Sequence, residues 1–568
     1  MSFGVSNLPS EAFTAGARRT GLFTLCLVLG LHGLAVILMA ATEVSLLGMV
    51  VFLLVWAMLN CLWLALVRRP TVAALLSLEV LALLTLLSRF KYDKLWMTID
   101  FVDIMIVDRD TVAFLLAIFP PLRWWTLLAA FATIAVIAFV WWRDSSRTSR
   151  SASLTGFLIS FVALIAVSLV WPTNLAEDFE GKSYVSKFAR SGVEAVHELA
   201  FRGYLEAAND VGENPKVVAN LVCHSARRLP HIILLHDESS FDITAAPGIK
   251  VPSGYRDHFR SFDGKARKFV VEGVGGPSWF TEYNVLTGLS VRSFGRFATS
   301  VTRIAAGRVY RGMPRALDLC GYRTFSLYPF YGAFLGSRAF QTTTGIENYL
   351  DMRDLGTRDF EVDSFYFDRA LELITRERSN GPLFLYVYTV ANHFPWDKHL
   401  RPELTPDWRA LGNRADVDEY VRRQGMSARD YRVLLQELAQ RFPTESFLIV
   451  RYGDHQPQFG AELIDPSLDQ AGLAMRAKAS DPRYRTTYYA IDAVNFAPAS
   501  VTSALDTIDA PYLPVVLMEA AGIPLEWDFA KEKAMLQRCG GIFYSCENGV
   551  PARQLNRLLI DAGLIKGL

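Results

Sequence analysis

Acidic and imidazole side chains follow three short apolar runs, at the point where each run ends. The runs are 232–235, 384–390 and 447–450, and the side chains that follow them are Glu238, His393, Asp454 and His455. Continuous apolar runs of this length are typical of strands buried on both faces of a parallel sheet. In open α/β sheets, ligands bind beyond the carboxyl ends of the strands. Because carboxylates and imidazoles are ligands for divalent metals, the pattern predicts a metal-centred active site.

A glycine-rich stretch at 272–288 adds a hydroxyl to this set. Pro277 favours the first turn of a helix and Gly288 favours its end, so Ser278 is predicted at a helix N-terminus. Free N–H groups at such a terminus stabilise a phosphate or a developing oxyanion. Serine is also a common helix cap, and its position alone does not separate the two roles. The acidic strand end upstream favours the role of a metal-bound nucleophile.

The first 171 residues have the composition of a membrane domain. Five apolar runs are each about long enough to cross a bilayer as a helix, at 21–42, 45–67, 71–88, 124–142 and 154–171. With five spans, the basic clusters at 18–19, 68–69 and 143–150 fall on one side, which is then the cytoplasm. The acidic and apolar segment 91–121 is interpreted as interfacial or re-entrant. The remainder of the chain is then expected in the periplasm, outside a bacterial inner membrane.

These patterns predict three parts: a five-span domain at 1–171, amphipathic connector helices at 172–229 and an α/β catalytic domain at 230–568 with a largely parallel central sheet. The net charge of +1, with no basic stripe, gives no case for nucleic-acid binding. Cys539 and Cys546 are predicted to close a small loop, which leaves Cys223 and Cys320 as the remaining pair outside the membrane. The patterns also predict His258 and Asp363 to be surface residues.

The motifs in this order resemble a known family. They are Glu238 after a strand, Ser278 followed by Glu282 and Tyr283, Asn392-His393-Phe394-Pro395, and Gly453-Asp454-His455. This set is similar to the extracellular domain of lipoteichoic acid synthases. It also resembles the periplasmic phosphoglycerol and phosphoethanolamine transferases of the alkaline phosphatase/sulfatase superfamily. The five-span membrane half matches the architecture of that family.

The resemblance implies a role for each site residue. Glu238, Ser278, Asp454 and His455 would bind one divalent metal, Mn²⁺ or Zn²⁺, with Ser278 as the nucleophile. His393 would contact the transferred phosphate or head group. Arg338 would correspond to an arginine that contacts the head group. The sequence departs from the family in having serine in place of the usual threonine nucleophile, and in lacking an evident tryptophan before the arginine.

The expected function is that of a membrane-anchored transferase. Ser278 would take a head group, with phosphoglycerol favoured, from a membrane phospholipid and pass it to a hydroxyl of a periplasmic or cell-surface glycan or glycolipid. Alternatives are a phosphoethanolamine transferase acting on lipid A or a surface glycan, a sulfatase-like hydrolase, and a non-enzymatic sensor. A true sulfatase is disfavoured because the residues after Ser278 lack the Cys/Ser-x-Pro-x-Arg motif. A sensor is disfavoured because all four predicted metal ligands are of competent type.

Overall fold

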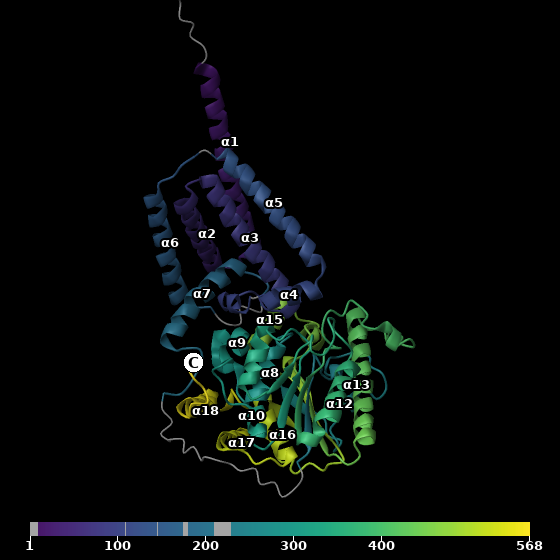
Figure 1. The fold of residues 1–568 in the computed structure, drawn as a ribbon. Helices are drawn as coiled ribbons and strands as arrows, with labels where there is room; N and C mark the ends of the chain where they lie inside the picture. Colours follow the sequence, from purple (N-terminus) through teal and green to yellow (C-terminus); the bar gives the residue numbers. More distant parts are fainter. Residues whose placement is uncertain (1–9, 108, 145, 174–179, 210–228) are drawn as a thin grey trace, which may run out of the picture. The chain divides into compact units, whose positions relative to one another are not determined.

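The computed structural model of the protein describes residues 10–107, 109–144, 146–173, 180–209 and 229–568 (Figure 1). The chain folds into two compact units, each with its own core. One unit comprises residues 1–101 and 118–197, and the other comprises residues 102–117 and 198–568. The predicted metal ligands all belong to the second unit.

Five helices of the first unit are long and apolar enough to cross a membrane. They are α1 (Ser10–Thr42), α2 (Leu46–Val67), α3 (Pro70–Leu95), α5 (Pro121–Arg143) and α6 (Arg150–Val170). In lipid a backbone must satisfy its own hydrogen bonds, so an apolar segment of this length forms a continuous helix. The predicted five spans are confirmed, and the protein is a multi-pass membrane protein.

The segment between the third and fourth spans contains only short helices. The 3₁₀ helix η1 (Phe101–Ile106) is followed by α4 (Arg109–Ile118), which has 10 residues. A helix needs about 20 apolar residues to cross the hydrocarbon core, so α4 is too short to add a sixth span. This agrees with the five-span interpretation of the sequence.

The connector contains one amphipathic helix, α7 (Tyr184–Phe201), among its described residues. Two polar side chains on the buried face of α7 bind the chain that follows the last span. Arg190 donates to the carbonyl oxygen of Trp171 at 2.6 Å, and Glu194 accepts from the N–H of Thr173 at 2.6 Å. A pair of helices was predicted here; residues 202–209 are not helical, and residues 210–228 lie outside the described residues.

The second unit is built on one eight-stranded sheet, with the order β4-β3-β5-β1-β6-β7-β2-β8. The strands are β1 (His231–Asp237), β2 (Arg267–Val270), β3 (Arg323–Leu327), β4 (Asn348–Leu350), β5 (Leu383–Tyr388), β6 (Phe447–Gly453), β7 (Thr486–Val494) and β8 (Thr507–Asp509). Every neighbouring pair is parallel except the two pairs that β7 makes with β6 and β2. The prediction of a largely parallel central sheet is confirmed.

Three central strands carry the apolar runs seen in the sequence. Every residue of β1, β5 and β6 is buried. In the register, Ile233 of β1 lies beside Leu385 of β5 and Ile449 of β6. Because these strands are parallel and aligned, their carboxyl ends meet at one edge of the sheet, as the sequence predicted.

Helices cover both faces of the sheet, which explains why the central strands are apolar on both sides. Figure 1 shows α12 and α13 on one face and α8 and α16 on the other. The α-helices that follow β1 are α8 (Ser278–Thr287), α9 (Val301–Ala305), α10 (Met313–Asp318), α11 (Ser337–Thr343), α12 (Asp363–Glu377), α13 (Ala415–Arg441), α14 (Gly460–Ile464), α15 (Gln470–Lys478), α16 (Leu513–Ala521), α17 (Trp527–Cys539) and α18 (Val550–Asp561).

A disulfide joins Cys539, the last residue of α17, to Cys546. The predicted closure of this small loop is confirmed. Cys223, the residue predicted to pair with Cys320, lies outside the described residues.

Candidate metal centre and nucleophile

The four predicted metal ligands meet at the carboxyl edge of the sheet. Ser278 Oγ lies 3.2 Å from Oε2 of Glu238 and 3.1 Å from Nε2 of His455. The same His455 nitrogen lies 3.4 Å from Oε1 of Glu238 and 3.2 Å from Oδ2 of Asp454. Glu238 directly follows β1, Asp454 and His455 follow β6, and Ser278 begins α8. The structure therefore brings together residues from three separate elements.

The close approach of two strand ends requires a glycine before Asp454. A Cβ atom added at Gly453 would lie 1.8 Å from the carbonyl oxygen of Ser240, in the turn after β1. Ser239 in that turn has a φ of 50°, in the left-handed region. Its N–H donates to Oδ1 of Asp454 at 2.6 Å, and its Oγ donates to Oε1 of Glu238 at 2.7 Å. The turn thus holds both carboxylates in place.

The protonation of His455 can be read from its other ring nitrogen. Nδ1 lies 2.8 Å from the carbonyl oxygen of Gln456, which can only accept, so Nδ1 carries the hydrogen. Nε2 is then the nitrogen that faces the carboxylates of Glu238 and Asp454 and that would bind a metal. Asp454 Oδ2 is buried and accepts no hydrogen bond among the described residues. Two carboxylates, an imidazole lone pair and a hydroxyl this close form a donor set that fits a divalent cation.

His236 extends this set. Its Nε2 lies 3.1 Å from Oδ2 of Asp454, and its Nδ1 lies 2.9 Å from the hydroxyls of both Tyr386 and Tyr452. His236, Glu238 and Asp454 each offer a ligand atom, and these atoms lie within 4.8 Å of one another. The geometry makes His236 either a further candidate ligand or the residue that orients Asp454.

Charge and burial shift the pKa of Asp454 in opposite directions. Burial raises the pKa of its carboxyl, but the adjacent His455 and His236 and the hydrogen bonds to the carboxylate outweigh this effect and hold the pKa at about 2. The carboxylate is therefore anionic at neutral pH, as a metal ligand must be.

Tyr388, the last residue of β5, completes the support of Glu238. Its hydroxyl donates to Oε2 of Glu238 at 3.0 Å, and its ring stacks on His236 with the centroids 3.7 Å apart. No sequence pattern indicated this role, because a tyrosine in an apolar strand is equally typical of core packing.

His393 lies in the loop after β5, between aromatic rings. Its ring centroid is 5.8 Å from that of Phe330, 4.9 Å from that of Phe360 and 4.3 Å from that of Phe394. Its Nδ1 donates to the carbonyl oxygen of Phe394 at 2.6 Å, which leaves Nε2 as the acceptor. Burial lowers the pKa of His393, although the nearby Glu238 raises it. The neutral ring therefore offers a lone pair for a proton at neutral pH.

Arg338 does not join the four clustered residues. It lies in the first turn of α11 with its side chain 46% exposed. It forms ion pairs with Asp351 at 2.9 Å and Asp354 at 3.5 Å, and it lies over the ring of Tyr349. Its predicted contact with a head group stays a prediction.

Glu282, another residue of the sequence motif, joins α8 to α11. Its carboxylate accepts hydrogen bonds from Ser337 at 3.0 Å and Gln341 at 2.9 Å, and burial raises its pKa. This pairing fixes the orientation of α8, and therefore of Ser278 at its start.

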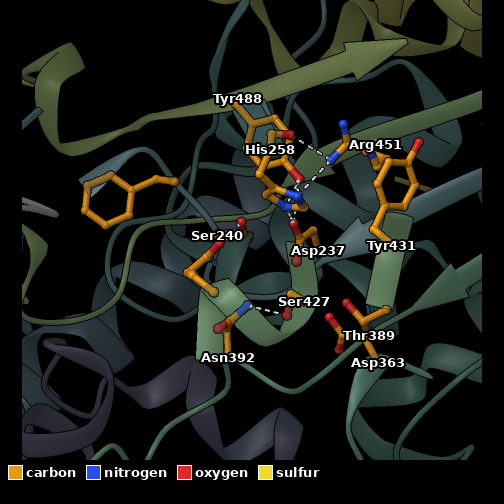
Figure 2. Close-up of polar contacts among 12 residues, drawn as sticks. Asp237, Ser240, His258, Asp363, Thr389, Asn392, Ser427, Tyr431, Arg451 and Tyr488 are labelled. Carbon is orange, nitrogen blue, oxygen red and sulfur yellow. Dashed lines mark hydrogen bonds and ion pairs between the residues drawn. The ribbon is translucent and has the colours of Figure 1, made fainter. Parts of the chain in front are cut away.

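A buried polar network surrounds Asp237, the residue before the predicted ligand Glu238 (Figure 2). Asp237 pairs with His258 at 3.1 Å and accepts a hydrogen bond from Tyr488. Arg451 donates to the carbonyl oxygen of His258 at 2.9 Å and lies over the ring of Tyr431. The side chain of His258 is only 5% exposed, so the prediction that it is a surface residue was wrong.

Asp363, the first residue of α12, belongs to the same region (Figure 2). It is 2% exposed and accepts from the N–H of Ala391 at 3.2 Å, in the loop that carries His393. Burial, together with the neighbouring Asp237 carboxylate, raises its pKa to about 8. The prediction of a helix-surface acid was wrong. The amphipathic pattern of α12 gave no sign that its first residue faces inward.

Comparison with known proteins agrees with this fold. Residues 280–491 match the sulfatase family model. The matched range includes His393, Asp454 and His455, while Glu238 and Ser278 precede it. No curated protein matches the chain in sequence.

Solved structures similar to this chain share little sequence with it. The Neisseria meningitidis lipooligosaccharide phosphoethanolamine transferase A has a TM-score of 0.49 and 11% identity, covering 87% of this chain and 99% of that chain. The Streptococcus pyogenes phosphoglycerol transferase GacH in complex with sn-glycerol-1-phosphate has a TM-score of 0.47 and 16% identity, covering 61% and 89%. The Listeria monocytogenes lipoteichoic acid synthase LtaP has a TM-score of 0.40 and 16% identity, covering 58% and 78%.

Proposed function

We propose that the protein is a metal-dependent phosphotransferase of the membrane that moves a phospholipid head group onto a hydroxyl of a glycan or glycolipid. Phosphoglycerol is the favoured group, and phosphoethanolamine, carried to lipid A or a surface glycan, is the alternative. The positions of the basic residues between the spans support a bacterial inner membrane protein with its catalytic unit in the periplasm. A membrane anchor suits an enzyme whose donor is a lipid.

The observation that carries the proposal is the place of the Ser278 hydroxyl. It begins α8 and lies 3.2 Å from Glu238 and 3.1 Å from His455, at the edge of a sulfatase-family sheet. We propose that Glu238, Ser278, Asp454 and His455 hold Mn²⁺ or Zn²⁺. A divalent ion bound there lowers the pKa of a hydroxyl and polarises a phosphoryl oxygen.

In the first step, Ser278 Oγ forms a bond to the phosphorus of the donor phosphodiester. The bond from phosphorus to the diacylglycerol oxygen breaks, and that oxygen takes up the proton that Ser278 gave up. The N-terminal end of α8 stabilises the negative charge on the transferred phosphoryl group. The product on the enzyme is a phosphodiester of Ser278 that carries the head group.

In the second step, the hydroxyl of the acceptor attacks the same phosphorus. Nε2 of His393 accepts the proton of that hydroxyl, which its free lone pair allows. The bond from phosphorus to Ser278 Oγ breaks, and the oxygen recovers a proton from His393. Both steps are displacements at phosphorus, so the serine is restored after each turnover.

Diacylglycerol release tests this function directly. The full-length protein in detergent, supplied with Mn²⁺ or Zn²⁺, is expected to release diacylglycerol from phosphatidylglycerol, or otherwise from phosphatidylethanolamine, and to stop when the metal is chelated. The half-buried Ser500, outside the cluster, serves as the control, and its Ser500→Ala variant should behave as the unaltered protein. The absence of diacylglycerol from both lipids with either metal would contradict the proposal.

A further inference from the structure

An open pocket of about 580 Å³ lies at the same edge of the sheet as the metal site. Its lining residues are Tyr331, Arg353, Gly356, Thr357 and Arg358. Four of them belong to the turn that follows β4, a strand parallel to β3 and therefore to the central strands. The carboxyl end of β4 thus points to the edge that carries the predicted ligands.

Two aromatic residues connect the pocket to the active site. Phe330 precedes Tyr331, and its ring lies 5.8 Å from that of His393. Phe360 follows Arg358 by two residues, and its ring lies 4.9 Å from that of His393. The segments that hold His393 between two rings therefore continue directly into the lining of the pocket.

The pocket is lined by two arginines and no acidic residue. The guanidinium of Arg353 lies 4.7 Å from the ring centroid of Tyr331. Neither Arg353 nor Arg358 forms an ion pair with the acids of the described ranges. Among the nearby acids, Asp351 pairs with Arg338 at 2.9 Å and Glu361 pairs with Arg401 at 2.9 Å. The exposed Asp359, which follows Arg358, forms no ion pair with either arginine within the described ranges. Both arginines are therefore available to an anion from solution.

We propose that this pocket binds an anionic group of the acceptor, and that a phosphate ester is the group it fits best. Two guanidinium groups supply the paired donors that phosphate oxygens accept, and the volume lies within the range of about 300–1,000 Å³ usual for ligand pockets. The assignment to the acceptor rests on the proposed function. Each proposed donor lipid carries a single phosphate, which the reaction places on Ser278. A second phosphate site at this edge of the sheet is therefore not needed by the donor, and we assign it to the acceptor.

Direct binding tests the pocket without any catalysis. Metal-stripped, full-length protein in detergent is titrated calorimetrically with inorganic phosphate. The double variant Arg353→Gln/Arg358→Gln is expected to bind phosphate about tenfold or more weakly, as the loss of charge-assisted hydrogen bonds implies. The matched control is Arg369→Gln, an arginine of α12 that pairs with Glu372 at 2.8 Å. Equal binding by the double variant and the unaltered protein, or no binding by the latter, would overturn the site.

Decay of the Ser278 adduct then tests the acceptor assignment. Glucose 6-phosphate is expected to accelerate decay of the adduct more than glucose does. In the double variant, this difference between the two sugars should be about tenfold smaller. The initial release of diacylglycerol should be unchanged in the variant. If diacylglycerol release in the double variant falls as much as adduct decay does, the pocket binds the donor instead. If the two sugars accelerate adduct decay equally in the unaltered protein, the acceptor role is overturned. If the unaltered protein forms no adduct but its phosphate binding needs both arginines, the proposed function fails while the anion site stands.

Discussion

Nε2 of His455 lies 3.1 Å from Oγ of Ser278, with Nδ1 of the same ring committed to the carbonyl oxygen of Gln456. Nε2 is therefore the ring nitrogen that faces the hydroxyl and that would bind a metal. The carboxylates of Glu238 and Asp454 surround the same point. Nucleophile and predicted metal ligands are thus one cluster, and changes to its supports should alter metal binding and turnover together.

Tyr388 is expected to support metal binding through Glu238. In Tyr388→Phe the 3.0 Å hydrogen bond to Oε2 of Glu238 is lost while the ring is kept. Loss of such a supporting hydrogen bond typically weakens metal affinity about 10- to 100-fold. A Zn²⁺ titration of the purified protein measures this, with the buried Tyr366→Phe of α12 as control. Unchanged Zn²⁺ affinity in Tyr388→Phe would show that Glu238 needs no such support.

His236 should matter for the same site through Asp454. Replacing His236 by Asn removes the nitrogen 3.1 Å from Oδ2 of Asp454 and the contacts with two tyrosine hydroxyls. We expect metal affinity to fall about 10- to 100-fold, with diacylglycerol release falling in parallel. Excess metal should restore the release. If turnover is lost while metal affinity stays at the unaltered value, His236 acts in some other way.

His393 should act in the second step rather than the first. The His393→Gln variant lacks the base that takes the acceptor proton, so adduct decay should slow about 10²- to 10⁴-fold while the adduct still forms. Time-resolved intact mass after acceptor addition follows both steps. The exposed His399→Gln, from the same loop region, is the control. The opposite result, impaired formation of the adduct with an unchanged rate of decay, would contradict the assignment of His393 to the second step.

Asp363 should make folding stability depend on pH. Its folded pKa of about 8 lies above the value of an exposed aspartate, so the folded state binds a proton that the unfolded state releases near pH 4. Stability is therefore expected to fall as pH rises from about 4 to about 8, by on the order of 1.4 kcal/mol per pKa unit. Asp363→Asn should flatten this dependence and raise the unfolding midpoint at pH 8.

Thermal unfolding of both proteins between pH 5 and pH 9 measures the effect. The exposed Asp318→Asn is the matched control and should follow the unaltered protein. A variant Asp363→Asn that keeps the full pH dependence would show that the carboxyl stays ionised in the fold.

The strand ends could be predicted from sequence because burial on both faces forces a parallel strand to be apolar. Polar residues such as Glu238 and Asp454 then stand out where each run stops. A polar residue that is buried because it pairs with residues far away in the sequence gives no such signal. Asp237 contacts Tyr488, which is 251 residues away, so only the fold reveals that His258 beside them is buried.

The pocket proposed to bind phosphate could also not be predicted from the sequence. Arg353 and Arg358 lie in a short turn rich in charge, which is typical of a solvated surface. Whether these arginines can bind an anion depends on which basic residues the neighbouring acids pair with. Asp351 pairs with Arg338, and no local sequence pattern predicts this pairing.

The most direct test of the account is intact mass of the full-length protein after incubation with metal and isotope-labelled phosphatidylglycerol or phosphatidylethanolamine, without acceptor. The account predicts a mass increase equal to the head-group phosphate, with release of diacylglycerol, and loss of both in Ser278→Ala. The control variant Ser500→Ala should keep both. An adduct that persists in Ser278→Ala would contradict the assignment of the nucleophile, and neither adduct nor diacylglycerol from either lipid would contradict the transferase itself.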